Sequence, residues 1–276
     1  MRWQIEHQER LLYRAKSGSP ILTIKFYSYP EYLQRIKIIQ QPDFTKLKKK
    51  GENSYFLFHR KVRTNGVISF DRIIQVLPQK RDLSLKEDWG NISNIPNKIM
   101  KKYQTSTEFW PQNSSIFHDP SLLEWFEEDY LKDWIMASVP YIRSKIKSPE
   151  KLEARVGVFR ALNEGVGDCD EFTDLFLTLT RRRGIPSRRL TGYHIQNDPH
   201  TAIPHAWAEI YSPIVGWITI DQALLNIGKH TDNYVILKIE EFHSNLADYF
   251  VNFANKTQVN FEWIRKTPNF VKIDPN

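Results

Sequence analysis

The chain has 276 residues, of which 41% are apolar and 13% aromatic, so it can fill the core of one large domain or of two modest ones. Lys and Arg outnumber Asp and Glu by 39 to 32, and this mild excess is spread along the chain, so we expect no binding to nucleic acid. The single cysteine excludes an intrachain disulfide and a cysteine-based zinc cluster. We therefore expect neither a metal nor a cofactor.

The cellular location is also constrained by composition. No apolar run approaches the ~18 residues that a membrane-spanning helix needs. The N-terminal sequence MRWQIEHQERLLYRAK is charged throughout and lacks the apolar segment of a signal peptide. One cysteine in a chain of this size fits a reducing compartment. We expect a cytoplasmic protein that does not associate with membranes.

Residues 1–115 are predicted to form a strand-rich N-terminal region that begins with a short helix. Three segments rich in β-branched and aromatic residues are expected to be strands: 21–27, 55–62 and 67–76. The pair Asn65-Gly66 separates the last two and is typical of a tight hairpin turn. The lysine-rich segment 46–51 is predicted to be a solvated loop, with a patch for an acidic partner as the alternative.

Residues 116–276 are predicted to form a second, catalytic domain that begins with helices. A proline followed by a capping-box pattern predicts a helix over 120–139, and Pro149 predicts another that ends near Asn163. The polar segment 78–120 contains two tryptophans that require burial, so we expect it to be packed on the surface rather than free.

A third helix is predicted to begin at Cys169. Asp168 is a good N-cap, Glu171 completes a capping box, and apolar residues recur at helical spacing from Phe172 onward. Gly184 followed by proline predicts the end of this helix. Unpaired N–H groups and the helix dipole favour an anion in the first turn, so we expect a lowered pKa for the Cys169 thiol.

Three strands are predicted to follow the Cys169 helix: 188–195, 205–211 and 217–221. A hairpin register that pairs Ile210 with Gly216 would place His205 opposite Asp221. Together with Cys169 these residues would form a nucleophile, a base and a carboxylate that orients the base. The backbone N–H of Cys169 is available as one oxyanion donor. Two other histidines lie close in sequence and stay open as the base: His194 and His200.

Several segments resemble the transglutaminase-like core of the papain-like cysteine-enzyme superfamily, in particular its microbial members. They are GDCDE at 167–171, RGIPSR at 183–188, HAWAEIY at 205–211 and GWITID at 216–221. The resemblance covers about residues 120–240. It implies an α+β fold with a papain-like core, in which a helix carrying the nucleophile packs on an antiparallel sheet. By match of motif, it implies Cys169 as nucleophile, His205 as base and Asp221 as the residue that orients the base.

Some family features are absent or altered. The family often has Asp-Pro-Thr where this chain has Asp-Gln-Ala at 221–223, which keeps the carboxylate. The zinc-binding cysteines of the glycan-releasing relatives are missing, and no calcium-loop signature is present. For the second oxyanion donor, a tryptophan in some members, the candidates are Trp110 and Trp134.

The sequence therefore predicts an enzyme that transfers acyl groups from peptide or side-chain amides through a thioester on Cys169. We expect a protein or peptide substrate and hydrolysis, as in a cysteine protease or amidase, because the polar segment 196–201 before His205 offers no apolar tunnel that would exclude water. Two alternatives stay open. One is a transglutaminase that uses an amine acceptor and cross-links proteins, and the other is a catalytically inactive binding module with the same fold.

Overall fold

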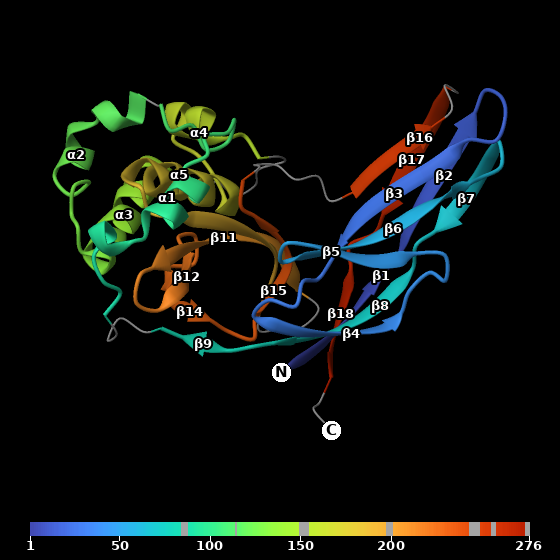
Figure 1. Ribbon diagram of the computed structural model, residues 1–276, viewed down its shortest axis with the longest axis horizontal. Helices are drawn as coiled ribbons and strands as arrows, with labels where there is room; N and C mark the ends of the chain where they lie inside the picture. Colours follow the sequence, from blue (N-terminus) through green and yellow to red (C-terminus); the bar gives the residue numbers. More distant parts are fainter. Residues whose placement is uncertain are drawn as a thin grey trace.

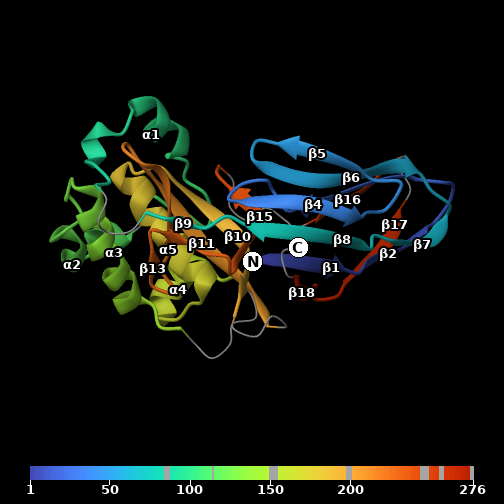
Figure 2. The ribbon, with the colours of Figure 1, turned by 90° about the horizontal axis from the view of Figure 1, so that it is seen from below.

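The structure is a computed structural model that describes residues 1–83, 88–113, 115–148, 155–196, 201–242, 249–254 and 258–273. Two lobes lie side by side, one made of strands and one made of helices around a sheet (Figures 1 and 2). We call residues 1–78 and 249–273 the β lobe, and residues 81–242 the α/β lobe. Helices and antiparallel sheets together confirm the expected α+β fold class. No helix in the described segments is long and apolar enough to cross a membrane.

The β lobe contains two layers of strands that share one hydrophobic core. One layer consists of β16 (Tyr249–Ala254), β3 (Ile21–Ser28), β6 (Asn53–Lys61) and β5 (Lys46–Lys50). The other consists of β18 (Asn269–Ile273), β1 (Arg2–His7), β8 (Arg72–Pro78) and β4 (Gln34–Gln40), continued by β17 (Val259–Arg265), β2 (Glu9–Ala15) and β7 (Asn65–Ser69). Aromatic rings fill the space between them, as in the stack of Phe70 on Trp263 with centroids 5.4 Å apart.

The first 15 residues are two strands, so the expected N-terminal helix is wrong. In β1, Trp3, Ile5 and His7 are buried and alternate with partly exposed residues, which is the two-residue period of a strand with one face in a core. Pairing of β1 with β8 and β18 supplies its backbone partners. The charged residues between the buried ones simply face outward.

Asn65-Gly66 does not form the predicted hairpin turn. Both residues belong to β7, and they pair with Arg14 and Tyr13 of β2. A Cβ on Gly66 would lie 2.9 Å from the hydroxyl of Tyr13, so glycine at this position leaves room for the Tyr13 ring. The turn signal was misleading because a packing requirement can also select glycine.

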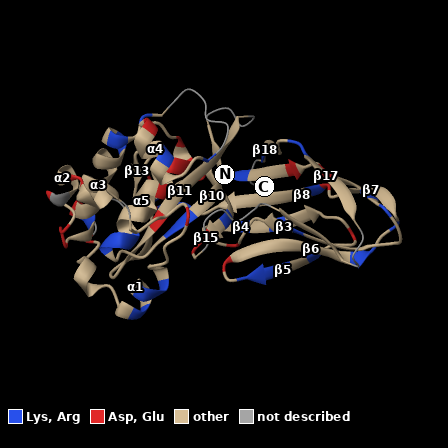
Figure 3. Cartoon of the chain, turned by 90° about the horizontal axis from the view of Figure 1, so that it is seen from above, with Lys and Arg blue, Asp and Glu red and all other residues tan. Residues whose placement is uncertain are grey.

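The actual tight turn lies at Gly51, whose φ of +60° favours glycine, between β5 and β6. The lysine-rich segment is therefore an edge strand and not the predicted loop. All five residues of β5 are exposed, and Figure 3 shows the strand in the colour of Lys and Arg. Lysines on an edge strand oppose pairing with another sheet, which accounts for this composition without a partner.

The last three strands return to the β lobe. β16, β17 and β18 pair with β3, β2 and β1 respectively. The division of the chain into 1–115 and 116–276 stays a prediction. The sheets of the β lobe nevertheless combine strands from both parts. The chain thus crosses from the β lobe to the α/β lobe after residue 78 and returns after residue 242, so the two lobes are linked at two points.

The α/β lobe is built on a five-stranded antiparallel sheet with helices on one face. The strands, in order, are β13 (Asn226–Ile227), β12 (Gly216–Asp221), β11 (Ala202–Ser212), β10 (Ser187–Ile195) and β15 (Tyr234–Glu240). The helices are α1 (Asn97–Tyr103), α2 (Pro120–Leu123), α3 (Leu131–Lys145), α4 (Val158–Glu164) and α5 (Cys169–Arg183), with short 3-10 helices at Ile92–Asn94 and Ser115–His118. A two-stranded pair, β9 (Arg81–Asp82) with β14 (Lys229–His230), completes the lobe.

The helix predicted over 120–139 is interrupted. Its first turn ends at Leu123 and α3 begins at Leu131. The Arg183 side chain donates to the carbonyl oxygens of residues 126, 127 and 128, and the Trp134 indole donates to that of residue 126. These side chains satisfy the carbonyl groups that a continuous helix would have paired internally. Of the helix predicted over 149–163, the start lies outside the described residues and α4 forms the end.

The β11–β12 hairpin has a different register from the one predicted. Ile210 pairs with Ile218, and Ser212 pairs with Gly216. The turn therefore contains three residues, and Gly216 adopts a φ of 77°. His205 and Asp221 are not cross-strand partners in this register, so any contact between them must be made by their side chains.

Two side-chain amides of the β lobe cover the outer edge of β15. Gln34 donates to the carbonyl of Ile236 (2.7 Å) and accepts from its N–H (2.9 Å). Asn53 makes the same pair of bonds with Ile239, at 2.7 and 2.8 Å. Each side-chain amide thus takes the place of one residue of a neighbouring strand. The backbone of β15 therefore has hydrogen-bond partners on both edges.

We predict that Gln34→Ala lowers the free energy of unfolding by about 2–4 kcal/mol, because it leaves a buried N–H and a buried carbonyl without partners. Gln40→Ala is the matched control, since Gln40 lies on the same strand but is exposed. Urea denaturation followed by tryptophan fluorescence measures both. Equal, small effects of the two substitutions would show that the amide does not hold the lobes together.

Candidate active site

Cys169 is the first residue of α5, as predicted. The Asp168 carboxylate accepts from the N–H of Asp170 (2.9 Å), and the Glu171 carboxylate accepts from the N–H of Asp168 (3.1 Å). This is the expected capping box, and Gly184 ends the helix with a φ of 88°. The local sequence thus fixes the place and direction of the nucleophile helix.

The side chains of His205 and Asp221 meet although their residues are not paired in the sheet. His205 Nε2 lies 2.7 Å from Asp221 Oδ2, with His205 8% exposed and Asp221 fully buried. A carboxylate acceptor at this distance requires the proton on Nε2, so Nδ1 keeps its lone pair and is available as a base. Gly192 of β10 pairs with His205 of β11. It lies at a bulge in the pairing of β10 with β15, where a Cβ on this residue would clash with the carbonyl oxygen of Val235.

Asp221 is held as an anion by three donors. Besides His205, the N–H of Leu224 donates to Oδ1 (3.0 Å) and the phenol of Tyr234 donates to Oδ2 (2.8 Å). Burial alone would raise the pKa of Asp221, but these hydrogen bonds and the charge of His205 lower it below its ordinary value. A permanently charged Asp221 can fix the tautomer and the orientation of His205.

Cys169 and His205 line one cavity of about 300 Å³. One turn after Cys169, the Thr173 hydroxyl donates to the carbonyl of Ala206 (3.2 Å), and the N–H of Ala206 points at the thiol. The start of α5 is therefore fixed against the strand that carries His205. The structure brings all three predicted residues together, while their catalytic roles stay a prediction.

The expectation of a lowered thiol pKa is wrong. Burial raises the pKa of Cys169 to about 12, and the carboxylates of Asp170 and Asp168 add to the effect. Ligand atoms of these three residues all lie within 4.8 Å of one another. Desolvation and two nearby negative charges outweigh the helix N-terminus, because each disfavours a thiolate. The resting thiol is protonated at neutral pH and needs a base to react.

Residues 168–170 are also the one group of candidate metal ligands within the described ranges. Two carboxylates beside a thiol occur commonly without an ion, so this group does not by itself indicate a metal site.

A buried charge network underlies the start of α5. Asp174 is fully buried and accepts from Arg155 (2.6 and 2.7 Å), from Arg189 (3.0 Å) and from the indole of Trp110 (2.8 Å). Arg189 also bonds to Asp170, so it fixes the position of one of the carboxylates beside the thiol. The sequence reasoning missed this network because the residues are far apart in the chain and form no motif.

Neither tryptophan proposed as a second oxyanion donor fits that role. The indole N–H of Trp110 is bound to Asp174, and that of Trp134 donates to the carbonyl of Phe126 (3.1 Å). Both indoles are fully buried and have structural partners. The backbone N–H of Cys169 thus stays the one oxyanion donor that we assign.

Of the alternative bases, His194 lies next to the site. Its ring centroid is 5.8 Å from that of His205 and 5.0 Å from that of Tyr234. Burial and the nearby His205 lower the pKa of His194, so it is neutral at pH 7. Because Asp221 bonds to His205, His205 is the better base. His200 lies outside the described residues.

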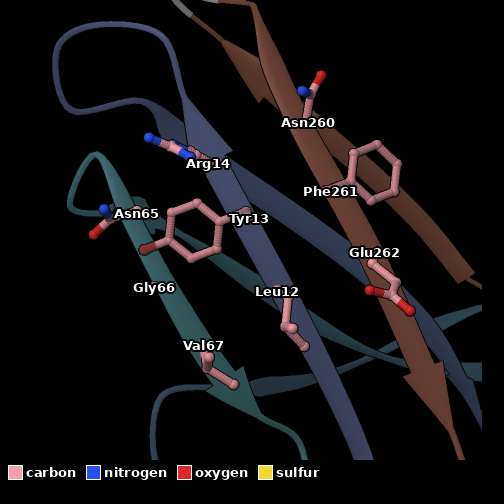
Figure 4. A pocket seen from close by; sticks show the side chains of 9 residues that line it. All are labelled: Leu12, Tyr13, Arg14, Asn65, Gly66, Val67, Asn260, Phe261 and Glu262. Carbon is pink, nitrogen blue, oxygen red and sulfur yellow. The ribbon is translucent and has the colours of Figure 1, made fainter.

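A larger cavity, of about 550 Å³, lies on the outer strands of the β lobe. Figure 4 shows its lining from β2, β7 and β17, including Tyr13, Arg14 and Glu262. It contains no thiol and no imidazole, and it shares no residue with the cavity at Cys169. Size alone therefore does not identify the active site.

Residues 123–222 match the family model of the transglutaminase-like superfamily. This part of the chain is thus similar to a transglutaminase-like core. The match confirms the resemblance found in the sequence, and it contains α5 and the strands that carry Cys169, His205 and Asp221. No curated protein matches the sequence.

Two solved structures are similar. The crystal structure of a candidate cysteine protease from Cytophaga hutchinsonii has a TM-score of 0.63 at 16% identity, over 100% of this chain and 93% of that one. The periplasmic domain of TgpA from Pseudomonas aeruginosa, bound to ethylmercury, has a TM-score of 0.38 at 14% identity, over 78% of this chain and 88% of that one. The first match shows that the fold of both lobes recurs, and the second is too low to support an argument.

We predict that Asp168→Asn makes the thiol more reactive. Asparagine is as good an N-cap as aspartate, so α5 is kept while one negative charge beside the thiol is lost. The thiol pKa should fall, and iodoacetamide labelling at pH 8 should become roughly three- to fivefold faster, since part of the gain in thiolate is offset by lower nucleophilicity.

The control is Asp43→Asn, because Asp43 is exposed and lies in the β lobe. Labelling is unambiguous, since Cys169 is the only thiol. The unsubstituted protein should be labelled more slowly than free cysteine. Faster labelling than free cysteine, unchanged in Asp168→Asn, would contradict the raised pKa.

Proposed function

We propose that this protein is a cysteine hydrolase that cleaves peptide or side-chain amides through a thioester on Cys169. The observation that carries the proposal is the 2.7 Å contact between His205 Nε2 and Asp221, beside a cavity that Cys169 also lines. A buried carboxylate that orients an imidazole toward a thiol at a helix N-terminus is the arrangement that acyl transfer requires. The transglutaminase-like core at 123–222 supports the same chemistry.

Because the resting thiol is protonated, the first step requires a general base. The Sγ proton moves to Nδ1 of His205 while sulfur bonds to the carbonyl carbon and the C=O electron pair moves to oxygen. The N–H of Cys169 donates to this oxyanion. Collapse breaks the C–N bond, and the proton on Nδ1 passes to the leaving nitrogen. Asp221 stabilises the imidazolium that exists between these transfers.

Water then hydrolyses the thioester, and His205 again acts as the base. It gives a proton to Nδ1 as its oxygen bonds to the acyl carbon. The C–S bond breaks, sulfur recovers the proton, and the carboxylic acid leaves. Six of the ten residues that line the cavity are charged: Arg155, Asp168, Asp170, Arg189, Lys238 and Glu240. Charged walls retain water, which supports hydrolysis over transfer to an amine.

The two alternatives have weaker support. An inactive binding module would have no need of a buried carboxylate bonded to the His205 imidazole. A transglutaminase would need a path that admits an amine and keeps water out, and the described lining of the cavity is polar.

We predict that Tyr234→Phe lowers kcat/KM roughly tenfold, because it removes a hydrogen bond to the charged Asp221. Since that bond favours the anion, its loss raises the pKa of Asp221 and moves the acid limb of the pH–rate profile to higher pH. Asn226→Ala is the control: the Asn226 side chain donates to the oxygen of Tyr234 (3.1 Å) and to the carbonyl of Lys229 (2.9 Å), and not to the Asp221 carboxylate. An unshifted acid limb in Tyr234→Phe would show that the phenol is only structural.

The choice of acceptor can be tested directly. Glutamine-containing peptides are offered with and without a fluorescent primary amine at millimolar concentration, and both hydrolysis and amine incorporation are followed. We expect hydrolysis to dominate and both signals to vanish in Cys169→Ala. Incorporation that outpaces hydrolysis, and depends on Cys169, would replace the hydrolase by a transglutaminase. A Cys169-independent signal would remove the thioester altogether.

A further inference from the structure

The cavity at Cys169 continues toward the β lobe. A second cavity, of about 270 Å³, shares Thr191 and Pro204 with it. Its remaining walls are Gly192, Tyr193 and Leu237 from the central sheet, Arg265 at the end of β17, and residues 266–268, which link β17 to β18. A chain that lies across Thr191 would therefore reach from the thiol to the β lobe.

The two cavities differ in charge. Around Cys169, three cationic and three anionic side chains are present, and Arg189 pairs with both Asp170 and Glu240. The described lining of the second cavity contains Arg265 and Lys266 but no carboxylate. Lys266 is exposed, and its ammonium donates to the side-chain amide of Gln8 (3.0 Å), which is neutral.

The residues behind the second cavity add to its positive potential. Arg265 lies 3.4 Å from a carboxylate oxygen of Glu9, and the same oxygen accepts from Arg72 at 3.2 Å. One buried carboxylate thus faces two guanidinium groups. Burial is the main cause of the lowered pKa of His7, and the charges of Arg72 and Arg265 lower it further. An anion in the second cavity would meet a positive field.

We infer that the second cavity is a substrate subsite that binds an acidic side chain of the peptide whose amide is attacked at Cys169. The inference rests on the proposed function, because it names the class of substrate for the same site. Lys266 is the specificity residue, since its ammonium is exposed in the cavity wall. Arg265 contributes charge from a more buried position.

The test uses Cys169→Ala protein, so that binding is measured without turnover. Two fluorescein-labelled Gly-Ala octapeptides serve as probes, identical except that one carries three Glu and the other three Gln. Fluorescence polarisation at low salt should show roughly fivefold tighter binding of the Glu peptide. Adding Lys266→Glu should abolish this preference. Adding Lys48→Glu, which changes the net charge equally on the distant strand β5, should leave it intact.

The outcomes separate this inference from the proposed function. Equal losses in the Lys266→Glu and Lys48→Glu proteins would overturn the subsite, because the preference would then follow net charge. No preference for the Glu peptide would overturn it as well. If the active protein cleaves peptides without an acidic preference, the function stands and the subsite falls. If the preference follows Lys266 but no peptide is cleaved, the subsite stands and the hydrolase falls.

Discussion

The geometry of the site depends on the buried ion pairs of Arg189. Its side chain lies on β10, is 3% exposed, and reaches three carboxylates: Asp170 and Asp174 of α5, and Glu240 of β15. Burial alone would lower the pKa of Arg189, but the three carboxylates raise it, so the guanidinium stays charged. Buried charges are tolerated only when their partners are well placed. This requirement fixes the first turn of α5 relative to the sheet, and with it the position of Cys169.

The same network determines the chemistry of the thiol. Asp170 is held beside Cys169 by Arg189, and Asp168 is held there as the N-cap, so both charges that oppose a thiolate are structural. A protonated thiol is a poor target for oxidation and for stray electrophiles. In the proposed mechanism it becomes a nucleophile only when a substrate carbonyl and the His205 base are both in place. The proposed mechanism thus couples the reactivity of the thiol to substrate binding, and it exchanges a ready thiolate for selectivity.

Local signals in the sequence predicted the nucleophile helix well, while long-range pairing could not be predicted. The capping box and Gly184 act within a few residues, so their pattern alone located α5. Strand register depends on partners elsewhere, and both hairpin predictions were wrong: Ile210 pairs with Ile218, and Asn65 starts a strand opposite β2. The return of the last three strands to the β lobe leaves no local signature either.

The candidate site shows the same division. Motif resemblance selected Cys169, His205 and Asp221, and the structure brings them together. It could not select Tyr234 as the third donor to Asp221, because nothing local distinguishes it from the other tyrosines. The predicted lowering of the thiol pKa was also wrong, because the helix N-terminus can be recognised in the sequence whereas burial is a property of the fold.

Strand β15 connects the β lobe to the chemistry. Its first residue, Tyr234, donates a hydrogen bond to Asp221, and its last, Glu240, forms an ion pair with Arg189. Between them, Ile236 and Ile239 are held by the amides of Gln34 and Asn53 from the β lobe. The strand that supports both the carboxylate and the charge network is thus positioned by the other lobe. A similar arrangement over the full length in the Cytophaga hutchinsonii protein, at 16% identity, shows that this two-lobed fold persists when most side chains differ. The β lobe is therefore best regarded as part of the scaffold of the site rather than as a separate attachment.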